Sequence, residues 1–313
     1  MNVTFSLSSG DPAADRRVDF ALMLFAQGSF SSAAETLLSA LELVPRWALG
    51  WYQLGEFYEA AGDIEASIAA WRAALALDPA DHSGAGLKLA LAGAQSDAAA
   101  MPGAFVEMLF DQYASKFDQA LVNGLGYRAP VVLEAAIRAT GRERFSLALD
   151  LGCGTGLMGE RLRPMCGRLE GVDISAEMLR KAHVKGLYDR LEKGDLRHYS
   201  HAGPQPDLLT AADVFMYVGA LEETFATVSR LLAPDGLFAF SVEKLDAADG
   251  FSLLHSRRYA HSEAYVRRIL SESGLAVVSV REERIRDDRK EPVGGLIVVA
   301  ERQPAEQPGK RFS

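Results

Sequence analysis

The stretch LALDLGCGTGLMGERL, residues 147–162, joins an apolar run to a glycine-rich corner and then to a helix-like pattern. The run 147–151 predicts a buried strand, and 157–163 predicts a helix. The three glycines between them are Gly152, Gly154 and Gly156. Because glycine has no side chain and adopts positive φ easily, this turn allows a ligand to lie against bare backbone. The first N–H groups of the following helix add free donors at the same corner.

From residue 105 onward, short apolar runs alternate with helical patterns. The predicted strands are 147–151, 169–172, 191–194, 207–211, 236–242, 275–280 and 296–300; the predicted helices are 105–125, 129–139, 157–163, 176–183, 222–232 and 261–272. This alternation predicts an α/β fold with a Rossmann-like, doubly wound, mostly parallel sheet. The last two runs have no helix between them, so they predict a final antiparallel strand. Ligands of such sheets bind at the carboxyl ends of the strands, where the glycines lie.

The residue before the glycines favours one of two ligands. Residues 154–159 read GxGxxG, a pattern also found in dinucleotide-binding turns. Asp150 closes the strand just before the glycines, and its carboxylate would repel the pyrophosphate of a dinucleotide. The same carboxylate would attract the ammonium and sulfonium groups of S-adenosylmethionine. The charge at this corner therefore favours S-adenosylmethionine, and a nicotinamide dehydrogenase stays as an alternative.

Two further acids end the next two predicted strands. Asp173 follows the second strand at the spacing from the glycines that places a carboxylate on ribose hydroxyls. Asp195 follows the third strand and can accept the adenine amino group, with the backbone of Leu196 facing the ring edge. Ile174 and Met178 would provide apolar surface for the adenine face. Dinucleotide enzymes do not require the acid at Asp195, so this spacing also favours S-adenosylmethionine.

A fixed period organises the first ninety residues. Segments 14–45 and 48–79 superimpose without a gap at an offset of 34 residues, the period of tetratricopeptide repeats. The second copy, WYQLGEFYEAAGDIEASIAAWRAALALDP, resembles that family. Its matching residues are Trp51, Leu54, Gly55, Tyr58, Gly62, Trp71, Ala74 and Pro79. Two repeats bury little apolar surface alone, and residues 82–93 predict a third, capping helix. Such repeats usually form interaction surfaces.

Residues 105–301 resemble class I S-adenosylmethionine-dependent methyltransferases in motif order, spacing and the final antiparallel strand. Together with the repeats, FDQYASKFDQALVNGLGYRAP at 110–130 makes the chain similar to bacterial predicted methyltransferases with N-terminal tetratricopeptide repeats. The resemblance implies S-adenosyl-L-methionine as the cofactor. The implied cofactor-binding residues are Asp150, Gly152, Gly154, Gly156, Asp173, Ile174, Met178, Asp195, Leu196, Ala211 and Tyr113, the last on a lid helix.

The resulting domain prediction has five segments. They are a disordered tail over 1–13, a small all-α tetratricopeptide domain over 14–94, a linker over 95–104, the methyltransferase domain over 105–301 and a disordered tail over 302–313.

Methyl transfer needs no fixed catalytic residue type, because in-line attack depends mainly on orientation. A general base is needed only where the attacking atom must lose a proton, and its identity stays unknown here. The candidates are Asp213 and Tyr217 after the fourth strand, and Tyr259 and His261 in the loop after the fifth. The segment AADVFMYV lacks the Asn/Asp-Pro-Pro-aromatic box that grips planar amino groups, which disfavours amino-methylation of adenine or glutamine.

The charge and the cysteine content of the chain disfavour some classes of binding partner and site. The net charge of −9 and the pI near 5.3 disfavour binding to nucleic acid through phosphates. Two cysteines and no His/Cys cluster predict neither a disulfide framework nor a metal site. We expect a cytoplasmic protein without a signal sequence or membrane span.

Two functions from different classes follow. The first is a methyltransferase acting on a small molecule or a protein side chain, with the repeats as an interaction surface. The second is a repeat-based binding module on a scaffold that binds the cofactor but does not catalyse. The intact glycines and three strand-end acids favour the first.

Overall fold

The computed structural model describes residues 8–95, 100–115, 117–118, 126–288 and 291–304. The chain forms two compact units. The helical unit comprises Met1–Val106 and Leu254–Arg257, and the sheet unit comprises Glu107–Leu253 and Arg258–Ser313. Every described helix is too short or too polar to cross a bilayer.

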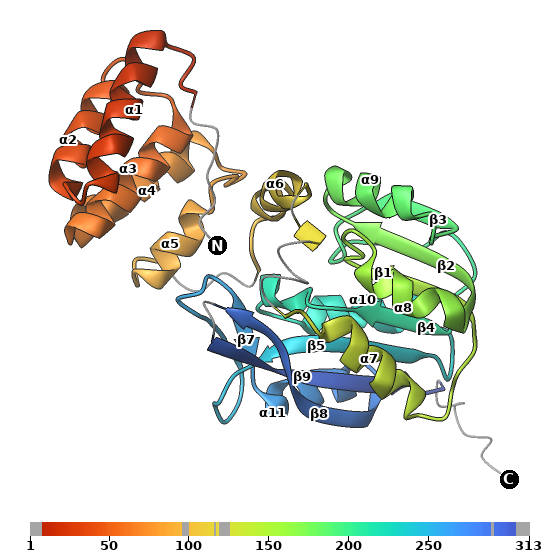
Figure 1. The fold of residues 1–313 in the computed structure, drawn as a ribbon. Helices are drawn as coiled ribbons and strands as arrows, with labels where there is room; N and C mark the ends of the chain where they lie inside the picture. The colour runs from red at the N-terminus through yellow and green to blue at the C-terminus, as the bar shows by residue number, and fades with distance from the viewer. Residues whose placement is uncertain (1–7, 96–99, 116, 119–125, 289–290, 305–313) are drawn as a thin grey trace, which may run out of the picture. The chain divides into compact units, whose positions relative to one another are not determined.

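The helical unit contains two helical hairpins and a short fifth helix (Figure 1). The helices are α1 (Pro12–Ala26), α2 (Phe30–Leu41), α3 (Ala48–Ala61), α4 (Ile64–Leu77) and α5 (Ala85–Leu91). Asp11 caps α1 by accepting hydrogen bonds from two backbone N–H groups, so the first helix starts inside the predicted tail. Gly62 ends α3 with φ +84°, as the repeat pattern predicts.

Close helix packing explains the small residue in the second repeat. A Cβ atom on Gly55 would lie 2.2 Å from the indole nitrogen of Trp71, so α3 and α4 meet at this glycine. Leu54 and Phe57 are buried, and the ring of Phe57 stacks on Phe25 of the first repeat at 4.5 Å. Each repeat therefore covers an apolar face of its neighbour.

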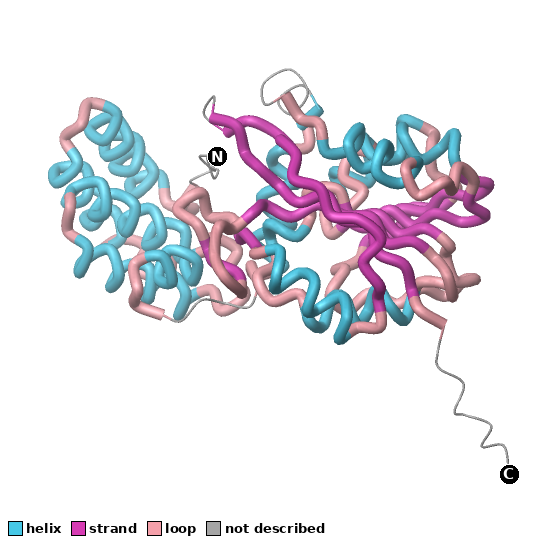
Figure 2. The backbone as a smooth tube through the Cα atoms, turned by 90° about the horizontal axis from the view of Figure 1, so that it is seen from below, coloured by secondary structure: helices cyan, strands magenta, loops and turns pink. Residues whose placement is uncertain are grey.

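The sheet unit holds nine strands with helices on both sides (Figure 2). The strands are β1 (Phe145–Leu151), β2 (Cys166–Asp173), β3 (Arg190–Lys193), β4 (Leu208–Ala211), β5 (Leu237–Lys244), β6 (Phe251–Leu253), β7 (Tyr259–His261), β8 (Leu275–Asp288) and β9 (Glu291–Arg302). The order is β3-β2-β1-β4-β5-β7-β6, and β9 pairs with both β5 and β8. Strands β1 to β5 are parallel, whereas β9 is antiparallel to β5 and β8. The predicted Rossmann-like sheet with its final antiparallel pair is thus confirmed.

The helices of this unit follow the predicted alternation. They are α6 (Gly103–Tyr113), which begins in the helical unit, α7 (Ala129–Arg138), α8 (Leu157–Leu162), α9 (Ala176–Lys185), α10 (Glu222–Leu231) and α11 (Glu263–Glu272), with short 3-10 turns at Arg163–Met165 and Phe215–Tyr217. One core lies between α7, α8 and the sheet. Four phenylalanines stack edge-to-face in another, namely Phe215, Phe225, Phe238 and Phe240.

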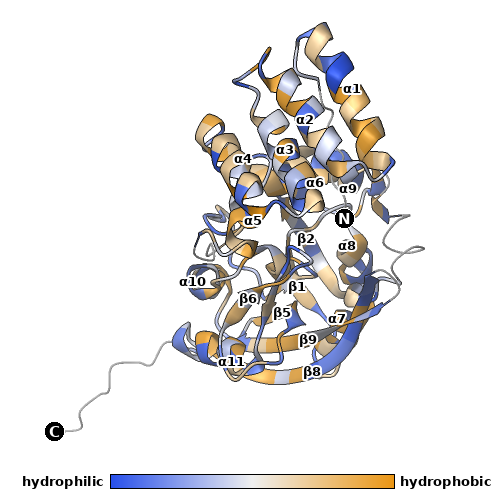
Figure 3. Cartoon of the chain, turned by 90° about the vertical axis from the view of Figure 1, so that its left-hand side faces the viewer, coloured by the Kyte–Doolittle hydropathy of each residue, from blue (hydrophilic) through white to orange (hydrophobic). Residues whose placement is uncertain are grey.

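Three predicted elements were wrong in extent or type. The helix expected over 105–125 ends at Tyr113, and part of the remainder lies outside the described residues. The loop expected after the fifth strand contains a short hairpin, in which β7 pairs with β6 and with the end of β5. The polar connection after residue 280 is mostly strand, because β8 and β9 continue their pairing to Asp288 and Glu291. Figure 3 shows this outer part of β8 in hydrophilic blue.

Candidate functional site

The glycine turn follows β1 at the carboxyl edge of the sheet. Gly152, Gly154 and Gly156 have φ values of +64°, +54° and +93°, which L-residues with side chains rarely adopt. A Cβ on Gly152 would lie 2.6 Å from Cγ2 of Val214, so this turn also packs closely on the segment after β4. The backbone N–H of Cys153 donates to the carbonyl of Val172, which ties the turn to β2.

Asp150 lies under this turn and is almost fully buried. Its two carboxylate oxygens accept hydrogen bonds from the hydroxyls of Tyr188 at 2.7 Å and Thr210 at 2.8 Å. Burial raises the pKa of Asp150 to about 7, against the opposing effect of the two hydroxyls. Asp150 on β1 therefore links β4 and the connection between α9 and β3 beneath the turn. The sequence analysis did not identify Tyr188 or Thr210, since both lie about 40 residues or more away.

Asp173 ends β2 and supports the turn directly. Its Oδ2 accepts a hydrogen bond from the N–H of Gly154 at 2.8 Å, and Oδ1 accepts one from the N–H of Ser175 at 2.8 Å. Burial is the main cause that raises the pKa of Asp173 to about 6. The nearby carboxylate of Asp111 adds to this effect. The structure thus brings the second strand-end acid to the glycines, as the spacing predicts.

The residues predicted to face adenine lie directly after β2, on α9 and after β3. Met178 is fully buried, and Ile174 is half-buried. Asp195 is half-buried and accepts hydrogen bonds at 3.0 and 3.1 Å from Nε of Arg197, while Leu196 is half-buried. Asp195 therefore has a local cationic partner, which lowers the pKa of its carboxyl group although burial opposes this.

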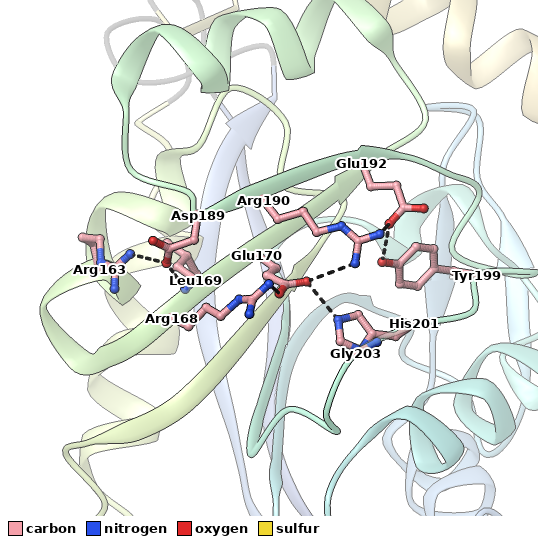
Figure 4. A network of polar contacts seen from close by, with 10 residues as sticks. All are labelled: Arg163, Arg168, Leu169, Glu170, Asp189, Arg190, Glu192, Tyr199, His201 and Gly203. Atoms are coloured by element: carbon pink, nitrogen blue, oxygen red, sulfur yellow. Dashed lines mark hydrogen bonds and ion pairs between the residues drawn. The ribbon is translucent and has the colours of Figure 1, made fainter.

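A separate polar network anchors the chain that continues from Leu196 (Figure 4). Glu170 on β2 is buried and contacts Arg168 at 2.7 Å and Nε2 of His201 at 2.9 Å. Nδ1 of the same ring accepts a hydrogen bond from the N–H of Gly203, so Nε2 carries the proton that Glu170 accepts. This pair holds the segment between β3 and β4 against the sheet. Its role is to position the segment that begins with Asp195.

The helix α6, which was predicted to be a lid, contacts the strand ends through residues other than the predicted Tyr113, which is half-buried. Asp111 accepts hydrogen bonds from the hydroxyl of Ser175 at 2.5 Å and from the N–H of Glu177 at 3.3 Å. Phe110 meets Tyr217 edge-to-face at 5.3 Å. Acidic and aromatic side chains of this segment thus cover the same edge of the sheet as the glycine turn.

The segment after β4 begins at the fully buried Ala211. Asp213 has φ +60°, and its carboxylate contacts the guanidinium of Arg286 at 2.6 Å. Tyr217 is buried, and burial raises its pKa to about 12. The sequence analysis did not identify Arg286, because it belongs to a strand that was expected to be a loop.

Tyr259 and His261 are both fully buried on β7. Nε2 of His261 donates towards the carbonyls of Val218 at 3.0 Å and Gly219 at 2.9 Å. Burial lowers the pKa of His261 to about 4. Full burial argues against direct contact with an acceptor, and their catalytic assignment stays an untested prediction. Among the described residues, no group of three or more His, Cys, Asp or Glu side chains could hold a metal ion.

Comparison with known proteins agrees with this geometry. Residues 148–236 match the methyltransferase domain family, and residues 48–81 match the tetratricopeptide repeat family. Methyltransferase-like protein 27 of Homo sapiens is 37% identical over 117 residues, which cover 36% of this chain and 46% of that protein. A malonyl-[acyl-carrier protein] O-methyltransferase of Enterobacter lignolyticus is 27% identical over 153 residues, 49% of this chain and 59% of its own length. The chain thus spans about half the length of these relatives.

A solved structure shows the same fold. The 1,6-didemethyltoxoflavin-N1-methyltransferase of Burkholderia thailandensis superimposes with a TM-score of 0.52 at 19% identity, covering 67% of this chain and 94% of that one. The strand order and the glycine turn agree with the two family matches. The chain therefore contains a Rossmann-like sheet unit whose residues 148–236 match the methyltransferase domain family, preceded by a helical unit in which residues 48–81 match the tetratricopeptide repeat family.

Proposed function

We propose that this chain is a methyltransferase that uses S-adenosyl-L-methionine and acts on a small molecule or a protein side chain. The observation that carries the proposal is the pairing of the glycine turn with Asp173, whose carboxylate accepts the N–H of Gly154. Bare backbone and a strand-end carboxylate meet there within hydrogen-bond distance. A turn that served only to connect β1 and α8 would not need this buried acid.

The residues present fit the cofactor in charge. Gly154 is the turn glycine whose Cβ position is open, with its nearest neighbour 3.9 Å away, so its bare backbone would face the methionine part, and Asp173 would accept from the ribose diol. Met178 and Ile174 provide apolar surface, and Asp195 and Leu196 are the candidates for the adenine edge. When bound, S-adenosylmethionine supplies an electrophilic methyl group on its sulfonium. Two buried carboxylates, Asp150 and Asp173, set a negative potential that favours a cationic ligand over a dinucleotide.

The remaining task of the protein is to orient the acceptor and exclude water. Phe110 and Tyr217 form an aromatic cover beside the strand ends, and Ala211 leaves little bulk at the end of β4. Orientation of this kind contributes roughly 7–11 kcal/mol to a bimolecular reaction. No described side chain is required as a general base by this geometry. Of the two candidates after β4, Asp213 contacts Arg286, and Tyr217 lies beside Phe110.

The proposal is tested by direct binding and by transfer. Isothermal titration of the full-length protein with S-adenosylhomocysteine should give one saturable site, and NADH should not compete. Methyl-labelled cofactor with a cell extract should then label an acceptor, whereas the Asp173→Ala variant should not. Saturable binding without any transfer would favour the second candidate, a binding module on an idle scaffold.

The repeats favour a protein partner in either case. The first 106 residues carry 12 acidic and 5 basic residues, so most of the net charge of −9 lies there. We propose that the repeats recruit a basic polypeptide, which would be the acceptor if the labelled product is a discrete protein. Cys153 and Cys166 are both buried thiols, which fits the cytoplasmic location that we propose.

A further inference from the structure

A buried group of charged side chains lies beside the segment after β4, outside the set that would hold the cofactor. Arg286 on β8 is 1% exposed and contacts the carboxylates of Asp213, at 2.6 Å, and Glu243. Burial alone would lower the pKa of this guanidinium, but the two carboxylates raise it above its usual range. Arg258, which directly precedes β7, is also buried, and it contacts Asp288 at 3.1 Å. The last hairpin therefore reaches the carboxyl edge of the sheet with a fixed positive charge.

Asp213 needs this support because of its backbone. Its φ of +60° lies in the left-handed region, which residues with a side chain rarely adopt and which Asp and Asn tolerate better than most. Two contacts hold it there in addition to its neighbours in the chain. Its N–H donates to the buried hydroxyl of Ser241 at 2.8 Å, and its carboxylate accepts from Arg286.

The conformation of Asp213 sets the position of the next residue. Val214 fills the space that a side chain on Gly152 would occupy, with Cγ2 2.6 Å from that Cβ position. An extended backbone at Asp213 would turn Val214 away from Gly152 and open the packing under the glycine turn. The hydroxyl of Tyr127 donates to the carbonyl of Ala212 at 3.4 Å and adds a further tie to the same segment.

We propose that Arg286 is a positioning residue for the cofactor site. By holding Asp213 in the left-handed conformation, it presses Val214 against the first glycine of the turn. This inference rests on the proposed function, since it concerns the turn that would receive the cofactor. It also removes Asp213 from the role of general base, because its carboxylate is engaged by a buried guanidinium.

The test compares variants that distinguish two effects: the loss of the ion pair between Asp213 and Arg286, and the cost of a positive φ at residue 213. Asp213→Asn keeps an acceptor for Arg286 and tolerates positive φ, so its affinity for S-adenosylhomocysteine should stay within about threefold of the wild type. Asp213→Ala keeps the backbone cost and loses the contact, and its dissociation constant should rise about tenfold. Asp235→Ala is the matched control, since Asp235 has φ +58° in an exposed turn at the other end of β5. It should lower the melting temperature without changing the dissociation constant.

A second pair of variants tests the arginine itself. Arg286→Lys keeps the charge but cannot contact two carboxylates in the same way, and it should weaken binding severalfold. Arg284→Lys changes the exposed neighbour that pairs with Asp287, and it should have no effect on binding. If Arg286→Lys and Asp213→Ala bind as tightly as the wild type, the inference is wrong. If the wild-type protein itself shows no binding, the proposed function fails instead.

Discussion

Replacing Asp173 by alanine isolates the contact on which the proposed cofactor site depends. In the structure this carboxylate is 8% exposed and accepts two backbone N–H groups at 2.8 Å. A ribose diol would add donors to the same oxygens. A hydrogen bond to a charged group contributes about 1.5–3 kcal/mol. The loss of one such bond corresponds to a rise in the dissociation constant of roughly 10- to 100-fold.

The assay is isothermal titration with S-adenosylhomocysteine, well below the melting temperature of each variant. Asp207→Ala is a matched control, because Asp207 also accepts two backbone N–H groups, from Ser146 at 2.9 Å and Leu147 at 3.0 Å. Asp207 lies at the amino end of β1, away from the turn. Both variants should lower the free energy of unfolding, but only Asp173→Ala should lose affinity. Unchanged affinity in Asp173→Ala, or equal loss in Asp207→Ala, would refute the ribose assignment.

Four other predictions use different readouts. Because the pKa values of Asp150 and Asp173 are raised to about 7 and 6, affinity for cationic S-adenosylmethionine should increase from pH 5 to pH 8, and more steeply than that for neutral S-adenosylhomocysteine; parallel profiles would contradict this. The same shifts mean that the native protein without cofactor binds more protons than the unfolded chain between about pH 4 and 7, so their contribution to the free energy of unfolding should fall across that interval in denaturant titrations. Gly55→Val should destabilise the helical unit by about 1–3 kcal/mol, because its side chain would meet Trp71 at 2.2 Å, while calorimetric cofactor affinity stays unchanged. His261→Gln should leave the pH profile of transfer between pH 6 and 8 unaltered, since the pKa of His261 lies near 4; loss of a titration in that range would restore it as a catalytic candidate.

Local signals in the sequence were enough to predict the sheet, the repeats and the glycine turn. Gly152, Asp150 and Asp173 lie at strand ends. The apolar runs predict where these strands end, and parallel strands bring their carboxyl ends to the same edge of the sheet. Gly55 and Gly62 were also predictable from local sequence, because the reason for each lies within one helical hairpin. Gly55 allows two helices to approach closely, and Gly62 adopts a positive φ between them.

The parts that were missed depend on partners distant in sequence. The hydroxyls of Tyr188, before β3, and Thr210, on β4, donate hydrogen bonds to Asp150. No rule of sequence spacing relates these two residues to Asp150. The sequence analysis did not identify Arg286, because it lies in a polar stretch that resembles a loop. In the structure Ile285 and Arg286 of this stretch are buried. The long pairing of β8 with β9 overrides the low apolar content there, since backbone hydrogen bonds need no particular side chain.

Two of the three outer strands of the described sheet, β3 and β8, are rich in charged side chains, whereas the third, β6, is the short strand Phe-Ser-Leu. The sequence of β3 is Arg-Leu-Glu-Lys, and β8 carries seven charged residues over Arg281–Asp288. An unpaired strand edge invites another chain to add to it, and charge on that edge makes the addition costly. The β3 and β8 margins are therefore protected against edge-to-edge aggregation, so neutralising the β8 charges should yield insoluble protein before it yields unfolded protein.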